Sequence, residues 1–316
     1  MRICKKDGRR VWIEWINRFQ KDAVTGQVTV LTVGVDITAR RRAAASARKK
    51  VERRRRDKTF EDVIASRITD EEFFSIAEES GFRLEPPLVC CMVVLDASDD
   101  QLNLLKKDSE EWQTWVDTAI DLIHARLRGL AWYTDHGIVI LQHRSKKSWA
   151  GSIHDAATWV TKISNLIKDV FRDIHHMIGI STTHTEVKTV YTQAYEAVRV
   201  GPVFHPDKYI HYWCDLGVNR LLIEQAKSTA GMAFIQDYLG PLLGPSLRNA
   251  EWLMTLKEIL SGDTMIVIAA RLHIHPKTLA FRKIRIKRLL QLEIDDPEER
   301  LNIAVALKLK QLREKL

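Results

Sequence analysis

The sequence predicts an α+β protein with strands at its beginning, a mixed centre and helices alone at its end. Runs rich in β-branched and aromatic residues open the chain before residue 38. Between residues 85 and 214 such runs alternate with segments of helical periodicity, and beyond residue 247 only the helical period remains. A chain of 316 residues is long enough for these three parts to be separate domains.

The first expected element is a β-hairpin. Its strands are VWIEWI at 11–16 and VTVLTVGVDI at 28–37, and DAVTGQ at 22–27 supplies the loop. Two strands alone are marginally stable in water. We therefore interpret this segment as the end of a larger β-domain.

This hairpin resembles the last two strands of a PAS sensor domain. The resemblance rests on the stretch DGRRVWIEW, which begins at Asp7, and on a closing GVDIT that leads into a charged helix. It covers residues 1–38, the C-terminal part of such a domain, whereas the ligand pocket is built mostly by the earlier part. The resemblance therefore implies a fragment of a sensor domain and no cofactor.

The segment after the hairpin is strongly basic. The chain has a net charge of +8, and residues 1–58 hold 18 Lys or Arg against 6 Asp or Glu. Residues 39–58 combine strong helix formers with almost no apolar stripe, which is typical of a solvated connecting helix. A phosphate-binding arm is the alternative. Helical spacing of apolar residues continues from Phe60 to Ala77, and Gly81 is expected to end that helix.

The centre of the chain has the element order β-α-β-β-α-β, followed by one more helix and one more strand. This order predicts a ferredoxin-like α/β sandwich. The expected strands are 88–97, 129–134, 137–143, 175–182 and 208–213, and the expected helices are 110–127, 157–174 and 189–201.

The same order resembles the GGDEF class of nucleotidyl cyclases. Those enzymes need a Gly-Gly turn and several carboxylates in the central hairpin, to approach phosphates and hold Mg²⁺. Here the hairpin carries Asp135, His136 and the single Gly137, and Asp96 stands alone at the end of the first strand. We therefore expect a GGDEF-like signalling domain that is not an enzyme, and a degenerate nucleotidyl cyclase is the alternative.

Neither a metal nor another cofactor is expected. The chain has four cysteines, Cys4, Cys90, Cys91 and Cys214. Their spacing matches neither a metal site nor a disulfide framework, which favours a cytoplasmic location. The adjacent His175 and His176 would point to opposite faces of a strand and could not share a metal. No apolar run approaches the roughly 18 residues that indicate a transmembrane helix, so no membrane partner is expected.

Residues 264–290 have the pattern of a helix, a tight turn and a second helix. An amphipathic helix at 251–262 precedes them. Ala269 is small at the point where the two helices would approach closely, and the turn is expected at 272–275. Pro276 suits the first position of the second helix, where its missing N–H costs nothing.

The second of these helices is predicted to bury Leu279, Ile286 and Leu289. The whole segment from Thr264 to Leu292 holds seven Lys or Arg and no acidic residue. A helix-turn-helix with this charge favours double-stranded DNA as its partner, and a basic helix in a solvated bundle is the alternative.

We expect the second helix to lie in the major groove. Base contacts are assigned to side chains that can reach base edges from its first turns, Lys277, Thr278, Arg282 and Arg285. Phosphate contacts are assigned to Lys283, Lys287 and Arg288.

This segment is similar to the C-terminal helix-turn-helix of the PucR/CdaR family, the regulators of purine catabolism and of sugar diacids. The family pattern A-x-x-L-x-[VI]-H-x-x-T-[LV]-x-[YF]-R is matched from Ala269 to Arg282, and DDPEERL follows at 295–301. The resemblance implies a transcription regulator that binds DNA as a homodimer and responds to a small-molecule effector of unknown identity.

Several positions depart from this family. Thr264 stands where Asn is usual, Lys283 replaces an apolar residue and Gln291 replaces Gly. Ile266 and Val267 are apolar where polar residues are usual.

Five parts are therefore expected in the chain. They are a PAS fragment at 1–38, a helical linker at 39–84, a GGDEF-like domain at 85–214, a helical connector at 215–247 and a helix-turn-helix domain at 248–316. Asp296 is expected to cap the last helix of that domain. A protein-interaction module without specific DNA binding is the alternative to a DNA-binding regulator.

Overall fold

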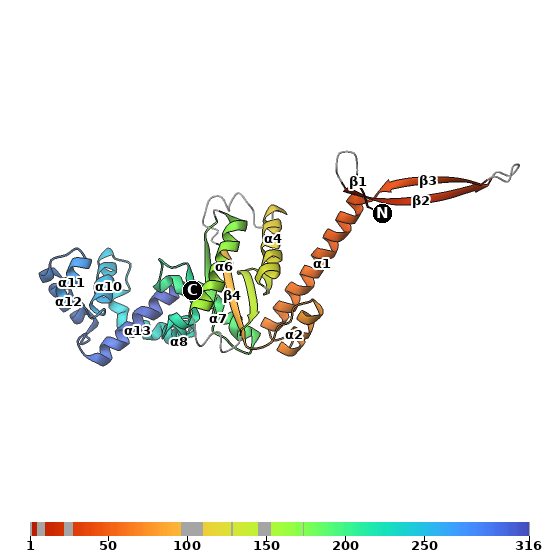
Figure 1. Cartoon of the computed structure of the whole chain (residues 1–316). Helices are drawn as coiled ribbons and strands as arrows, with labels where there is room; N and C mark the ends of the chain where they lie inside the picture. Colours follow the sequence, from red (N-terminus) through yellow and green to blue (C-terminus); the bar gives the residue numbers. More distant parts are fainter. Residues whose placement is uncertain are drawn as a thin grey trace. The chain divides into compact units, whose positions relative to one another are not determined.

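The computed structural model describes residues 2–4, 10–21, 28–95, 110–127, 129–144, 153–172 and 174–315. The chain divides into two compact units, Met1–Thr69 and Asp70–Leu316, which we describe separately (Figure 1). The expected loop at 22–27 and the isolated Asp96 lie outside the described residues. The fold is a mixture of helices and two sheets, which confirms the predicted α+β class.

The first unit contains a three-stranded antiparallel sheet. Its strands β1 (Arg2–Cys4), β2 (Arg10–Lys21) and β3 (Val28–Asp36) lie in this order. The hairpin of β2 and β3 is therefore confirmed, whereas β1 was not predicted because three residues are too few to show a strand pattern. Phe19 is 72% exposed, and Ile16 on the opposite face is 49% exposed. Within this unit neither face of the hairpin therefore forms a closed core.

Helix α1 (Thr38–Ile64) follows β3 directly. The backbone N–H of Trp12 donates to Thr38 Oγ1 at 2.8 Å. The Arg41 guanidinium lies 4.0 Å from the centroid of the Trp12 ring. These two contacts connect the start of the helix to β2. The basic segment is thus helical, as its residue types predicted.

The predicted continuous helix through 60–77 is wrong. Helix α1 ends at Ile64, and a separate helix α2 (Asp70–Glu79) begins six residues later. Ser66 lies between them with a left-handed φ of 57°. Three acidic residues in the first turn of α2 favour a new helix start there, because they complement the positive end of the helix dipole.

The second unit contains a five-stranded sheet of the predicted element order. The strands are β4 (Leu88–Leu95), β5 (Leu130–Thr134), β6 (Gly137–His143), β7 (His176–Ile180) and β8 (Ile210–Tyr212), and the helices are α4 (Glu110–Leu127), α6 (Ile153–Phe171) and α7 (Val187–Phe204). The strands lie in the order β5-β6-β4-β7-β8. Only the β7–β8 pair is parallel, so β4 is a central strand paired with antiparallel neighbours on both sides.

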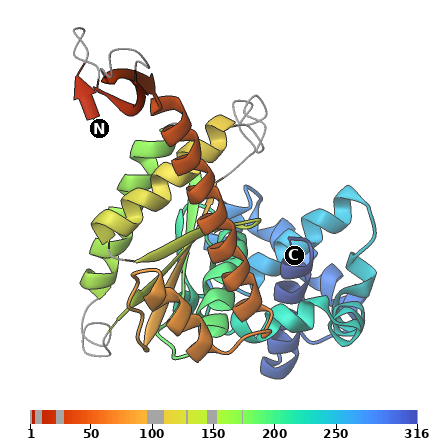
Figure 2. The same cartoon turned by 90° about the vertical axis from the view of Figure 1, so that its right-hand side faces the viewer.

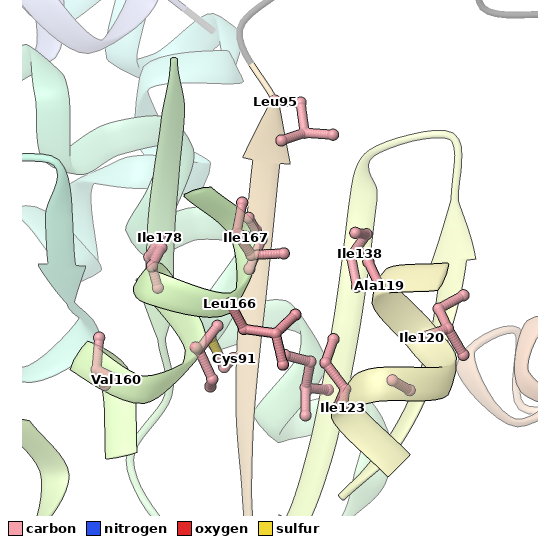
Figure 3. Close-up of a cluster of buried hydrophobic side chains, with 14 of the residues drawn as sticks. Cys91, Leu95, Ala119, Ile120, Ile123, Ile138, Val160, Leu166, Ile167 and Ile178 are labelled. Atoms are coloured by element: carbon pink, nitrogen blue, oxygen red, sulfur yellow. The ribbon is translucent and has the colours of Figure 1, made fainter. Parts of the chain in front are cut away.

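The two faces of this sheet are covered by different helices (Figure 2). Alternate residues of the strands, with Cys91 on β4 and Ile178 on β7, pack against α4 and α6 in one apolar core (Figure 3). On the other face α7 approaches so closely that a Cβ on Gly179 would lie 2.1 Å from the carbonyl oxygen of Ala194. Cys90 and Cys91 are free thiols buried within this sheet, and their burial raises the pKa of both.

The C-terminal part of the second unit is helical. It consists of α8 (Asn219–Lys227), α9 (Thr229–Leu239), α10 (Leu247–Ile259), α11 (Met265–Arg271), α12 (Pro276–Leu290) and α13 (Pro297–Arg313), with two short 3₁₀ turns, Trp213–Leu216 and Gly240–Leu242. One apolar cluster joins these helices and includes Leu216, Leu279 and Leu312. None of the helices in the described part of the chain is both long and apolar enough to span a bilayer.

Helix α13 holds the helical part together by polar contacts as well. The Lys308 ammonium donates to Asn219 Oδ1 at 3.1 Å, and the Arg313 guanidinium donates to the carbonyl oxygen of Ala226 at 3.0 Å. At its other end Asp296 accepts hydrogen bonds from the N–H groups of Glu298 and Glu299, which confirms the predicted helix cap. The helix after the helix-turn-helix therefore connects it to α8.

Candidate nucleic-acid interface

Helices α11 and α12 form a helix-turn-helix at the predicted place (Figure 1). The turn is tight because His273 adopts a left-handed φ of 54° and the Ile274 N–H donates back to the carbonyl oxygen of Ala269 at 3.0 Å. Ala269 itself is buried, as its small size predicted.

The second helix starts and packs as the sequence indicated. Pro276 occupies its first turn, and the Lys277 N–H donates to Nδ1 of His275 at 3.2 Å. Leu279 and Ile286 are fully buried, and Leu289 packs partly buried against the same core. The opposite face of α12 is therefore turned away from the apolar core.

The end of α12 shows why glycine is usual in the family at position 291. Gln291 follows the helix with φ 56° and ψ 32°, a left-handed conformation. Glycine adopts this conformation without the clash between Cβ and the carbonyl oxygen that a side chain brings. The glycine that is usual in the family would thus relieve strain at this position.

We expect Gln291→Gly to raise the free energy of unfolding by about 0.5–1 kcal/mol, because relief of left-handed strain exceeds the added entropy of the unfolded chain. Urea denaturation of the full chain measures this difference. Gln311→Gly is the matched control, because Gln311 lies inside α13 and glycine there should lower stability by about 1 kcal/mol. Destabilisation by both substitutions would contradict the strain at Gln291.

Arg282, predicted to contact bases, is engaged within the protein. Its guanidinium donates to Glu251 Oε2 at 2.8 Å and to Thr255 Oγ1 at 3.2 Å, both on α10. Its side chain is 21% exposed. The arrangement gives Arg282 a positioning role: it fixes α12 against α10.

Lys283 and Lys287, predicted to contact phosphates, also have acidic partners. Lys283 Nζ lies 2.6 Å from Asp295 Oδ1, and its hydrogen bond lowers the pKa of that carboxyl. Lys287 pairs with Glu293, which raises the pKa of the ammonium. The loop after α12 thus neutralises two charges that the acid-free stretch 264–292 left uncompensated.

The remaining predicted residues, Lys277, Thr278, Arg285 and Arg288, are exposed. Across the residues that the structure describes, none of the three cations among them has an ion-pair partner. These three cations, together with Phe281 and Ile284, have the spacing of one helix face. That face lies opposite Leu279 and Ile286. We call Lys277, Phe281, Ile284, Arg285 and Arg288 the outward stripe.

The sequence analysis matched Phe281 to the family pattern but placed neither Phe281 nor Ile284 among the contact residues. Their exposed fractions are 69% and 53%. The spacing of four and seven residues from Lys277 was a signal that could have placed them on the same face as the cations.

We expect Arg282→Ala to lower the free energy of unfolding by about 1 kcal/mol, because it removes a charge-assisted hydrogen bond and leaves the buried Thr255 with one partner fewer. Arg285→Ala is the control, because Arg285 is exposed on the same helix and should change stability by less than about 0.5 kcal/mol. Urea midpoints of the two variants measure the contrast. Equal midpoints would contradict the positioning role.

Among the described residues, the central hairpin of the sheet contributes to no metal-binding cluster. Asp135 and His136 are exposed at its tip. In the described ranges no group of three or more His, Cys, Asp or Glu side chains is placed to hold a metal ion. Glycine is needed at position 137 for a structural reason, because a Cβ there would lie 2.2 Å from the carbonyl oxygen of Val93.

Comparison with known proteins assigns the C-terminal segment to a class. Residues 252–309 match the family described as the PucR C-terminal helix-turn-helix domain. The match begins in α10 and ends in α13, so it includes both helices of the motif and the outward stripe. These residues therefore form a helix-turn-helix domain of the PucR type, which belongs to a class of DNA-binding domains.

Over most of the chain, the similarity to a solved structure is weak. The crystal structure of a regulator of polyketide synthase expression from Bifidobacterium adolescentis is 17% identical, with 81% of this chain and 97% of that chain covered and a TM-score of 0.32. No curated protein matches the chain. The assignment to the PucR type therefore rests on the helix-turn-helix domain and covers residues 252–309.

Proposed function

We propose that this protein is a transcription regulator that binds double-stranded DNA through the outward face of α12. The observation that carries the proposal is a PucR-type helix-turn-helix whose second helix holds three cations on one exposed face, none with an ion-pair partner among the described residues. Free cations can replace the counterions of DNA phosphates, whereas cations already paired within the protein contribute less.

The ion pairs divide the predicted contact residues into two groups. Lys277, Thr278 and Arg285 lie exposed on the first two and a half turns, from which a recognition helix reaches base edges. Arg288, one turn further, is placed for a phosphate contact. Arg282, Lys283 and Lys287 act mainly by holding α12 against α10 and against the loop 291–296.

The other parts of the chain would supply the signal. In this proposal residues 1–38 are a PAS fragment, 39–84 a linker, 85–214 a GGDEF-like signalling domain without catalysis, 215–247 a connector and 248–316 the DNA-binding domain. An unidentified small-molecule effector would change the arrangement of two DNA-binding domains in a cytoplasmic homodimer, so that they match or mismatch paired half-sites. Contacts between the connector and the DNA-binding domain support this proposal: Lys308 and Arg313 on α13 contact α8.

Selection of duplexes from a random library by the full chain tests the proposal. We expect the selected duplex to bind about 10³-fold more tightly than random DNA in fluorescence anisotropy at physiological salt. The affinity should fall steeply with salt for both duplexes, because phosphate contacts are common to them. Equal, weak binding of selected and random DNA would instead favour a basic interaction module.

A further inference from the structure

We propose that α12 recognises the C5-methyl groups of thymine, with Phe281 as the principal contact and Ile284 beside it. This inference rests on the proposed DNA binding and deepens it, because it names the chemical feature of the half-site that these side chains would recognise. The major groove displays that methyl group on every thymine, and phenylalanine is one of the side chains that contact it.

The first observation is the position of the phenyl ring. Phe281 lies one turn after Lys277 and one turn before Arg285 on the same face of α12. Its side chain is 69% exposed, so it makes little contribution to the core beneath the helix. Ile284 follows three residues later and is 53% exposed.

The second observation is that cations flank these apolar side chains. Each is flanked along the helix by cations that have no partner in the described residues, namely Lys277, Arg285 and Arg288. A purely apolar partner would leave three charges desolvated, at a cost in free energy. A DNA major groove satisfies both kinds of group, because its edges are phosphates and its floor carries thymine methyls among base-pair edges.

The third observation concerns what the residue at 281 cannot do. Phenylalanine has no hydrogen-bond donor or acceptor, so it cannot distinguish bases by hydrogen bonding. It can distinguish them by apolar contact and by shape. Burial of one methyl group favours binding by about fourfold. A half-site with two contacted thymines would thus gain more than tenfold over its demethylated counterpart.

Deoxyuridine isolates this effect, because it lacks the methyl group and keeps every hydrogen-bonding atom of thymine. The duplex selected by the full chain is resynthesised with deoxyuridine replacing thymine, at one position at a time and at all positions together. Anisotropy then measures the dissociation constants for the full chain and for Phe281→Ala. Because Phe281 is exposed, its truncation should leave the urea midpoint unchanged.

We expect the full chain to lose about fourfold in affinity at one or two particular positions and little at the others. Phe281→Ala should lose affinity for the thymine duplex and become insensitive to deoxyuridine at those positions. Ile266→Ala is the matched control, because Ile266 is an exposed apolar residue of α11, outside the stripe. It should retain the full sensitivity to deoxyuridine.

The possible failures are distinguishable. Specific binding with equal affinity for thymine and deoxyuridine duplexes would overturn the methyl contact and leave the proposed function standing. Equal sensitivity of the full chain and Phe281→Ala would overturn the assignment to Phe281. Failure to bind any duplex selectively would overturn both proposals and favour an acidic protein surface as the partner of the stripe.

Discussion

Replacing Lys277, Arg285 and Arg288 with alanine should weaken binding of the selected duplex by about 100-fold or more. The three side chains are the cations of the outward stripe, and their removal eliminates both base-edge and phosphate contacts. The slope of the logarithm of the binding constant against the logarithm of the salt concentration should become shallower by about one, because Arg288 is the one side chain of the three that is assigned to a phosphate. Anisotropy across a salt series measures both quantities.

Two control variants distinguish the loss of affinity caused by lost contacts from the loss caused by a lower net charge. The first replaces Arg126, Lys162 and Lys208, which are exposed cations of the α/β domain, and so removes the same charge elsewhere. The second replaces Lys283 and Lys287, which lie on α12 and are already paired with Asp295 and Glu293. We expect less than about tenfold loss from either control. A loss equal to that of the triple variant would mean that α12 attracts DNA only through its overall charge.

The largest expected effect on stability is that of Gly137→Ala. Gly137 has a φ of +135°, a conformation that side chains rarely adopt, and its Cβ would lie 2.2 Å from the backbone carbonyl oxygen of Val93. That carbonyl belongs to the central strand β4, which pairs on both sides and cannot move away. We therefore expect a loss of about 3 kcal/mol or more. The thermal midpoint should fall by roughly 6–12 °C.

Gly81→Ala is the matched control for backbone strain without a clash. Gly81 also has a positive φ, of 87°, but no heavy atom lies within 4 Å of the place of its Cβ. Its substitution should cost only about 1 kcal/mol. Similar losses for both variants would mean that conformational strain alone makes glycine necessary at the hairpin. In that case the contact with Val93 would contribute nothing.

The helix-turn-helix could be located from sequence because its signals are local. The spacing of Leu279 and Ile286, the small Ala269 and the position of Pro276 each depend on residues a few positions apart, and all three are confirmed. The same holds for α4 and β6, whose observed bounds coincide with the predicted ranges. Period and turn chemistry determine such elements before any tertiary contact forms.

The break between α1 and α2 shows where local signals fail. The apolar spacing from Phe60 to Ala77 continues across the break, so periodicity alone predicted one helix. Asp70 also has a tertiary role, because its carboxylate accepts the Val187 N–H at 3.1 Å at the start of α7. This contact joins residues 117 positions apart, and no pattern within the segment could indicate it.

The sequence by itself determined that a basic helix-turn-helix of the PucR type ends this chain. Tertiary structure alone decided which of its cations are free. The stretch from Thr264 to Leu292 contains no acid, so all seven of its cations were equivalent in sequence. Folding pairs four of them with acidic residues: Glu251 from α10, Glu293 and Asp295 from the loop after α12, and, for Arg271, Glu258 and Asp263. An ion pair requires two charges that lie close together in space. Helix packing therefore decides which cations have no partner among the described residues and which apolar side chains lie between them.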